Sequence, residues 1–201
     1  GLVDPEDDGE VLVHVGDEVR EGLIADMDPD ELVAAVEDLD IDDLADLVEE
    51  SVRSLKPLAE QLGVRIGLDL TRGPVCLADA RQLGSAVTNL VDNALKYSDA
   101  GTPVAVSVRP GDGWADVVVT DGGIGIPQPE LERVFERFYR VDKARSRDTG
   151  GTGLGLAIVR NVARAHGGEI LVSSREGEGS TFTLRLPLVS VPAGDKEARR
   201  G

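Results

Sequence analysis

Patterns typical of helices and of strands alternate along most of this chain, and this alternation restricts the fold more than any other feature of the sequence. From residue 44 onward, apolar residues keep a helical spacing through Leu55 and Leu58. From Val64 to Leu70, every second residue is apolar, as in a strand. Further on, the patterns predict a short strand at 75–77, a long helix at 79–97, a strand pair at 104–108 and 114–120, loops at 121–151, a helix at 152–166 and a hairpin at 170–173 and 180–186. This order predicts an α+β fold, a two-layer α/β sandwich with its helices on one face of a mixed sheet.

Acidic residues are concentrated in the first quarter of the chain. Residues 1–50 hold 20 acidic side chains and one base, Arg20, whereas residues 51–201 hold 18 acidic and 20 basic side chains. This break predicts three parts: an acidic segment at 1–50, a domain at 51–190 and a disordered polar tail at 191–201. The acidic segment would repel nucleic acid and anionic membrane, so neither is expected as a partner. We find no run of about 18 apolar residues and no signal peptide, which favours a cytoplasmic location.

The acidic segment shows helical spacing of its own. Apolar residues recur in three short groups, around Leu23, Val33 and Leu47, and two similar stretches of about a dozen residues follow each other between residues 28 and 50. With residues 9–27 before it, this repeat resembles part of the acidic helical cytoplasmic domain of bacterial magnesium channels. That resemblance would make the chain an engineered fusion. A generic solvated helical segment explains the pattern equally well, so no metal site is assigned here.

Four side chains form a stripe along one face of the helix predicted at 79–97. Asn89 and Asn93 are four residues apart, and Lys96 and Tyr97 extend the same face. Amide oxygens can ligate a hard cation that shares the phosphates of a nucleotide, and the ammonium group of Lys96 would add a positive charge. Taken alone, such a polar stripe is more often a solvated surface.

Two glycine-rich segments follow. Asp121 comes at the end of a predicted strand and precedes Gly122-Gly123-Ile124-Gly125-Ile126. A carboxylate there can accept a hydrogen bond from an exocyclic amine, and small residues let a flat base approach the backbone. A second segment, Gly150-Gly151-Thr152-Gly153-Leu154-Gly155-Leu156, leads directly into a helix, whose free N–H groups and positive end attract an anion. Each segment alone is also compatible with an ordinary glycine turn.

The order of the motifs is more specific than any one of them. They are an Asn-x-x-x-Asn helix, Asp-x-Gly-x-Gly after a strand, Phe-Glu-Arg-Phe-Tyr-Arg at 135–140, Gly-Thr-Gly-Leu-Gly-Leu at 151–156 and Gly-Glu-Gly-Ser-Thr-Phe at 177–182. In this order they resemble the ATP-binding catalytic domain of sensor histidine kinases, over residues 52–190. The resemblance implies the histidine kinase and gyrase type of ATP-binding fold, with ATP and Mg²⁺ as ligands.

The same resemblance implies a role for each matching position. Asn93 would ligate Mg²⁺ with Asn89 nearby, and Lys96 would contact phosphates. Tyr97 would pack on the adenine, and Asp121 would accept a hydrogen bond from its amine. The base pocket would be shaped by Gly123, Gly125 and Ile126.

Residues 127–152 resemble the mobile ATP lid of that family. The resemblance implies that Phe135 and Phe138 anchor the lid on the core and that Arg140 contacts phosphates. Other lid bases form a cluster suited to polyphosphate: Arg133, Arg137, Lys143, Arg145 and Arg147. Phosphate oxygens would be held by the last glycine-rich segment, at Gly151, Thr152, Gly153, Leu154, Gly155 and Leu156.

Two positions bear on the reaction. Gyrase-type, chaperone-type and mismatch-repair ATPases share this fold and need a general base to activate water, and they carry a glutamate at the position of Asn89. Because an amide cannot accept a proton, Asn89 favours phosphoryl transfer to a protein. An anti-sigma-factor serine kinase shares the fold too, but the motifs at 135–140 and 151–156 favour a sensor kinase. Many family members have Asn where this chain has Gly122, which predicts a modest loss of affinity and not inactivation.

The histidine that such a kinase phosphorylates is not recognisable in this sequence. The family places it on a separate dimeric helical hairpin, before an acidic residue and an Arg-x-Pro stretch, and neither His14 nor His166 has such neighbours. No catalytic residue is therefore assigned within this chain.

Two functions remain open at this point. One is a catalytic domain that phosphorylates a dimerisation domain and, through it, serves a response regulator, within a membrane-anchored parent kinase. The other is an ATP-binding interaction module without turnover. A monomer is expected, because dimerisation in the family belongs to the hairpin.

Overall fold

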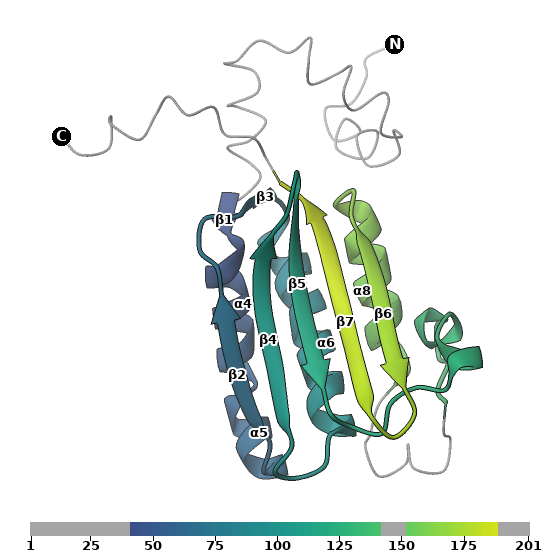
Figure 1. The fold of residues 1–201 in the computed structure, drawn as a ribbon. Coiled ribbons are helices and arrows are strands. Elements are labelled where there is room, and N and C mark those ends of the chain that lie inside the picture. Colours follow the sequence, from purple (N-terminus) through teal and green to yellow (C-terminus); the bar gives the residue numbers. More distant parts are fainter. Residues whose placement is uncertain (1–40, 142–151, 189–201) are drawn as a thin grey trace, which may run out of the picture.

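A five-stranded mixed sheet forms the centre of the structure, and helices cover one of its faces (Figure 1). The structure is a computed structural model that describes residues 41–141 and 152–188. In spatial order the strands are β2 (Arg65–Leu70), β4 (Pro103–Pro110), β5 (Trp114–Asp121), β7 (Gly179–Pro187) and β6 (Glu169–Arg175). Only β2 and β4 pair in parallel within this sheet, and the other neighbours are antiparallel. The predicted two-layer sandwich is confirmed.

The helical layer contains α4 (Leu44–Ser54), α5 (Lys56–Leu62), α6 (Ala80–Tyr97) and α8 (Gly155–Ala165). Two short 3-10 turns, η1 (Gln128–Glu130) and η2 (Arg133–Phe135), follow β5. The carboxylate of Asp79 caps α6 by accepting hydrogen bonds from the backbone N–H groups of Arg81 and Gln82. Within the described residues, 41–141 and 152–188, no helix is both long and apolar enough to span a membrane.

The core lies between α6 and the central strands. On α6, Val87, Leu90 and Leu95 are fully buried, and every second residue of β5 points towards them. Burying a side chain of this size stabilises the fold by about 1.5–3 kcal/mol. The position and rotation of α6 are therefore strongly fixed, and this matters because its other face lines the site described below.

The start of the described chain differs from the sequence prediction. The pattern of the acidic segment predicts helices only, but Ile41–Asp43 forms a strand, β1, that pairs antiparallel with β3 (Val75–Leu77). Pairing gives these backbone groups partners that a helix could not supply before its first turn. The cap is Asp43, which accepts from Ala45 N at 2.9 Å and from Gly73 N at 3.1 Å.

A second difference concerns the helix expected through residues 55 and 58. It is broken into α4 and α5 at Leu55, and Pro57 lies in the first turn of α5. Proline is tolerated there because the N–H groups of a first turn have no partner within the helix.

Helix α4 continues through residue 50, where the charge pattern predicts a domain boundary. Leu44 and Val48 are buried in the same core as α6, and the cluster continues to Val52. On the outer side of α4, Arg72 from the loop after β2 forms ion pairs with Asp46 and, at 3.0 Å, with Glu49. The division at residue 50 stays a prediction, as do the helices expected in residues 1–40 and the tail at 191–201, which lie outside the described residues.

Replacing Leu44 by alanine tests whether the first turn of α4 belongs to the cooperative fold. Because Leu44 is 1% exposed, we expect Leu44→Ala to lower the free energy of unfolding by about 2–5 kcal/mol. Urea denaturation followed by the fluorescence of the single tryptophan, Trp114, measures it. Glu50→Ala, on the exposed side of α4, is the control. An unchanged midpoint for Leu44→Ala would favour a boundary at residue 50.

Candidate functional site

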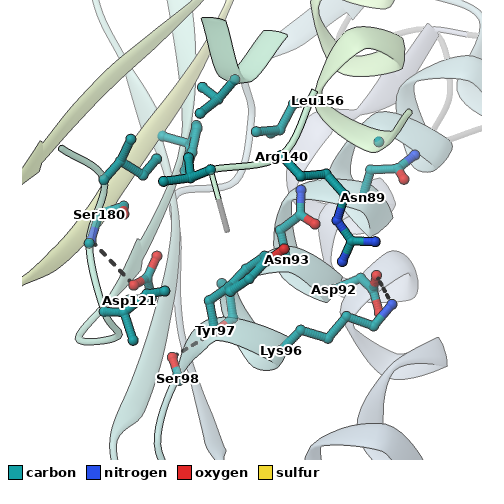
Figure 2. Close-up of a pocket in the computed structure, with 18 of the residues that line it drawn as sticks. Asn89, Asp92, Asn93, Lys96, Tyr97, Ser98, Asp121, Arg140, Leu156 and Ser180 are labelled. Atoms are coloured by element: carbon teal, nitrogen blue, oxygen red, sulfur yellow. Dashed lines mark hydrogen bonds and ion pairs between the residues drawn. The ribbon is translucent and has the colours of Figure 1, made fainter. Parts of the chain in front are cut away.

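A cavity of about 420 Å³ opens between α6, the loop after β5 and the start of α8 (Figure 2). Its volume lies in the usual range for small-molecule sites. Twelve of the predicted site residues line it: Asn89, Asn93, Lys96, Tyr97, Asp121, Gly125, Ile126, Arg140, Thr152, Gly153, Gly155 and Leu156. Gly123 and Leu154 are not among the lining residues, and Gly151 lies outside the described residues.

Helix α6 supplies one wall of the cavity. Asn89, Asn93, Lys96 and Tyr97 lie on the face opposite its buried residues, as the predicted stripe requires. Lys96 Nζ donates to a carboxylate oxygen of Asp92 at 2.7 Å, one turn earlier. This wall therefore presents two amides, an ion pair and an aromatic ring to the cavity.

Asn89 is held by a hydrogen bond within α6 and lies against the start of α8. Its Nδ2 donates to Ser85 O at 2.8 Å. A Cβ added at Gly155 would lie 2.9 Å from Asn89 Oδ1, so a side chain at residue 155 would displace the amide oxygen. Gly155 thus allows α8 to begin directly against the polar face of α6.

Asp121 forms the opposite end of the cavity. It is 7% exposed, and its Oδ1 accepts hydrogen bonds from Gly123 N at 2.9 Å and Ser180 N at 3.2 Å. Both of these bonds end on the same oxygen, which leaves Oδ2 to face the cavity (Figure 2). Burial raises the pKa of Asp121, and the two backbone N–H groups partly oppose this rise. The ionised carboxylate can only accept hydrogen bonds.

The loop after β5 packs tightly between two backbone segments. A Cβ at Gly123 would lie 2.1 Å from Tyr97 O, and one at Gly125, where φ is +68°, would lie 2.0 Å from Arg175 O. Ile124 N donates to Tyr97 O at 3.3 Å, while its carbonyl accepts from Gly177 N at 2.7 Å. Only glycine fits at residues 123 and 125, so the loop is held between α6 and the β6–β7 turn.

The start of α8 brings backbone donors to the cavity. No side chain caps this helix, and the first-turn residues Gly155 and Leu156 line the cavity. N–H groups of a first helical turn lack partners within the helix and attract anions. Arg140 also lines the cavity, and its side chain extends towards Asn89 and Asp92 on α6 (Figure 2).

One predicted packing role is confirmed and another is wrong. Phe135 is buried and makes an edge contact with Phe182, with ring centroids 6.4 Å apart. Phe138 was expected to anchor the lid too, but its side chain is 72% exposed. Its N–H donates to Gly153 O at 2.9 Å, and its backbone takes the left-handed conformation at φ +65°, unusual for a bulky residue, with the ring directed outward.

The predicted basic cluster is only partly at the cavity. Arg133 lies over the ring of Tyr139 at 4.2 Å and forms ion pairs with Glu130 and Glu136, and it does not line the cavity. Lys143, Arg145 and Arg147 lie outside the described residues. Among the predicted lid bases in the described part of the chain, Arg140 alone lines the cavity.

Several lining residues had no role in the sequence prediction. Helical spacing could have identified Asp92, which is three residues after Asn89 on the same face. Strand alternation could have identified Ser180, which is buried on the same side of β7 as Phe182. The remaining such residues come from α6, from β7 and from the segments that follow α6 and β5: Ala94, Ser98, Asp99, Ile124, Val134, Tyr139, Val141 and Phe182.

Comparison with known proteins identifies the family. A family model described as "Histidine kinase-, DNA gyrase B-, and HSP90-like ATPase" matches residues 78–190, more than half of the chain. The chain belongs to this ATPase family. The family match covers α6, the glycine-rich loop after β5 and α8, so it includes every element that lines the cavity.

Relatives within the family are sensor kinases. The sensor-like histidine kinase SenX3 of Mycolicibacterium smegmatis is 48% identical over 162 residues, which cover 81% of this chain and 42% of that protein. The sensor histidine kinase RppB of Synechocystis sp. is 42% identical, covering 74% of this chain and 33% of that protein. This chain therefore spans less than half of the length of these curated relatives.

Solved structures agree with these relatives. The mycobacterial sensor histidine kinase MprB has a TM-score of 0.66 at 32% identity, covering 75% of this chain and 97% of the MprB chain. Full-length ShkA in complex with AMPPNP has a TM-score of 0.67 at 29% identity, covering 77% of this chain and 32% of that chain. The prediction that the chain carries the ATP-binding catalytic domain of a sensor histidine kinase is confirmed.

The acidic segment matches a different family model. The MgtE intracellular N domain matches residues 1–53, which confirms the resemblance found in the sequence. This match overlaps α4 from Leu44 to Arg53, although α4 packs in the core of the ATP-binding fold.

Asp121→Asn separates the stability of the site from its function. A raised pKa means that the ionised form is disfavoured in the folded state, so stability is lost as pH rises through the folded pKa. We therefore expect Asp121→Asn to unfold at an equal or higher temperature than the parent at pH 7. This advantage should shrink as the pH falls to 4.

Thermal unfolding by circular dichroism between pH 4 and pH 8 measures both effects. Asp112→Asn, in the exposed β4–β5 turn, is the control. A lower midpoint for Asp121→Asn at pH 7 would mean that the two hydrogen bonds to the carboxylate outweigh the cost of its burial.

Proposed function

We propose that this chain is the catalytic part of a two-component sensor histidine kinase, which binds ATP with Mg²⁺ and transfers the γ-phosphate to a histidine on a separate dimerisation domain. One observation carries the proposal: a single cavity has an acceptor-only end at Asp121 and a donor-rich end at Arg140 and the start of α8. A nucleotide has the complementary polarity, with an amine on its base and anionic oxygens on its phosphates.

The base would bind at Asp121. Its Oδ2 can accept a hydrogen bond from the exocyclic amine of adenine, and the glycine-rich loop lets a flat ring approach the backbone. Tyr97 is 39% exposed at the rim, where its ring can pack on the base. A solved relative with AMPPNP bound supports a nucleotide in this fold.

Mg²⁺ would be held by Asn93, with Asn89 nearby. Both side chains line the cavity, and amide oxygens suit a hard cation that keeps several waters and binds phosphates. When bound, the ion would neutralise charge on the phosphate oxygens. Arg140 and the backbone N–H groups of residues 152–156, including Gly153, would hold the remaining oxygens.

The side chain at residue 89 argues against simple hydrolysis. An amide stands at residue 89, and an amide cannot accept a proton from water. Asp92 lies one turn away, but its carboxylate is held by Lys96, whose Nζ lies 2.7 Å from Asp92 Oδ2. Asp121 is at the base end of the cavity. These positions support transfer to a protein acceptor in place of direct attack by water.

The acceptor histidine would come from a partner domain. His166 ends α8, where its Nε2 accepts from Asp79 N at 3.0 Å and its Nδ1 donates to Val162 O at 2.7 Å. The bond to Nε2 joins the end of α8 to the start of α6, and the bond from Nδ1 stays within α8. His166 does not line the cavity. We further propose a cytoplasmic, monomeric domain that acts through the dimerisation domain on a response regulator.

Phosphoryl transfer in trans tests the proposal. We expect the chain with labelled ATP and Mg²⁺ to phosphorylate the helical dimerisation hairpin that its family predicts in SenX3 of Mycolicibacterium smegmatis, the kinase with 48% identity over 162 residues. The label should be acid-labile, and replacing the acceptor histidine by glutamine should abolish it. Asp121→Asn should reduce the rate at least tenfold, because the lost charge-assisted hydrogen bond is worth about 1.5–3 kcal/mol.

Transfer could also fail because this chain does not recognise a hairpin from another kinase. A covalent link between the hairpin and this chain is the control for that failure. Joining the hairpin to residue 41 raises its effective concentration to about the millimolar range. Transfer in the tethered form alone would mean weak recognition. If ATP binds and neither form transfers phosphate, the chain is an ATP-binding interaction module without turnover.

A further inference from the structure

We infer that Ser174, which lies outside the cavity lining, sets the hydrogen-bonding direction at the base end of the cavity and thereby favours adenine over guanine. The inference rests on the proposed function, since it concerns nucleotide recognition at the same site. It assigns Ser174 as a positioning residue that acts through Ser180 and the loop after β5.

Ser174 lies on the edge strand β6, on the side of the sheet that faces the helices, and is half-buried. Its Oγ lies 2.8 Å from Ile126 N, 2.8 Å from Gly179 O and 2.9 Å from Ser180 Oγ. One hydroxyl thus joins the loop after β5 to the β6–β7 hairpin. Ile126 and Ser180, two of its three partners, line the cavity.

The chemistry of these partners determines where the protons lie. A hydroxyl has one proton to donate and two lone pairs. Ile126 N can only donate and Gly179 O can only accept, so Ser174 accepts from the first and donates to the second. Ser174 Oγ then has one lone pair left, which can form a hydrogen bond with Ser180 only as the acceptor of the Ser180 hydroxyl proton. All hydrogen-bonding capacity of Ser174 is then used.

Ser180 consequently faces the cavity with lone pairs. Its side chain is 7% exposed, so water cannot easily compete for its proton, and its own N–H already donates to Asp121 Oδ1. The base end of the cavity therefore presents two acceptors, Asp121 Oδ2 and Ser180 Oγ. The hydrogen bond from Ile126 N to Ser174 Oγ also fixes the distance between the loop after β5 and strand β6.

An edge made of acceptors discriminates between purine bases. Adenine carries an amine at its six-position and can donate to this edge, whereas guanine carries a carbonyl oxygen there. If the guanine oxygen lies against Asp121 Oδ2 and Ser180 Oγ, none of these three acceptors has a donor. The free-energy cost of leaving buried polar groups unpaired is larger than the net gain from one hydrogen bond. Without Ser174, the Ser180 hydroxyl is free to turn and donate to a guanine oxygen.

Ser174→Ala tests the inference through the ratio of two affinities. We expect the dissociation constant of a non-hydrolysable ATP analogue to rise about five- to tenfold, while that of the matching GTP analogue stays the same or falls. In the phosphoryl transfer reaction, the change should appear in KM for ATP at unchanged kcat. Ser174→Thr keeps the hydroxyl and should restore the parent ratio.

Ser173→Ala is the matched control, because Ser173 is the neighbouring exposed residue on the other face of β6. It should leave both affinities unchanged. If Ser174→Ala weakens ATP and GTP analogues equally, or if its effect is matched by Ser173→Ala, the inference is wrong while the proposed function stands. If the folded parent binds neither analogue, both are wrong.

Discussion

The packing of α6 against the central strands is the constraint on which the rest of the structure depends. One face of this helix is fixed by fully buried residues such as Leu90 and Leu95. The opposite face carries Asn89 and Asn93 into the cavity. Because the two faces of a helix are rigidly connected, the burial that fixes one face of α6 also sets the direction in which the amides of Asn89 and Asn93 point. Stability and site geometry are therefore two consequences of the same burial.

Close backbone contacts place the other walls relative to α6. Gly155 lets α8 begin against Asn89, and Gly123 lets the loop after β5 approach the last turn of α6. The same loop is held on its far side by Gly177 N and by the hydroxyl of Ser174. A buried carboxylate, Asp121, then joins the loop to β7. The cavity is thus assembled by contacts between segments far apart in sequence, and a side chain at Gly123 or Gly155 would separate two walls.

The sequence predicted the layers, most strands and most of the cavity lining. Strand alternation predicts the hairpins, and the i, i+4 spacing of Asn89 and Asn93 predicts that both lie on one face of the helix. Features that depend on tertiary contacts were not predictable in this way. Strand β1 exists because β3 supplies its partners, and the exposed ring of Phe138 follows from a left-handed backbone residue that no local pattern indicates. The alignment of Ser174 with Ile126 requires the fold, since the two residues are 48 positions apart.

Calorimetric titration with a non-hydrolysable ATP analogue, with and without Mg²⁺, tests the central claim most directly. We expect micromolar to millimolar binding by the parent, with a dependence on Mg²⁺ that Asn93→Ala removes. Asp121→Asn should weaken binding whether or not Mg²⁺ is present, because it acts at the base end of the cavity. If the folded parent shows no binding, or if Asn93→Ala leaves the Mg²⁺ dependence intact, the assignment of this cavity as the ATP and Mg²⁺ site is contradicted.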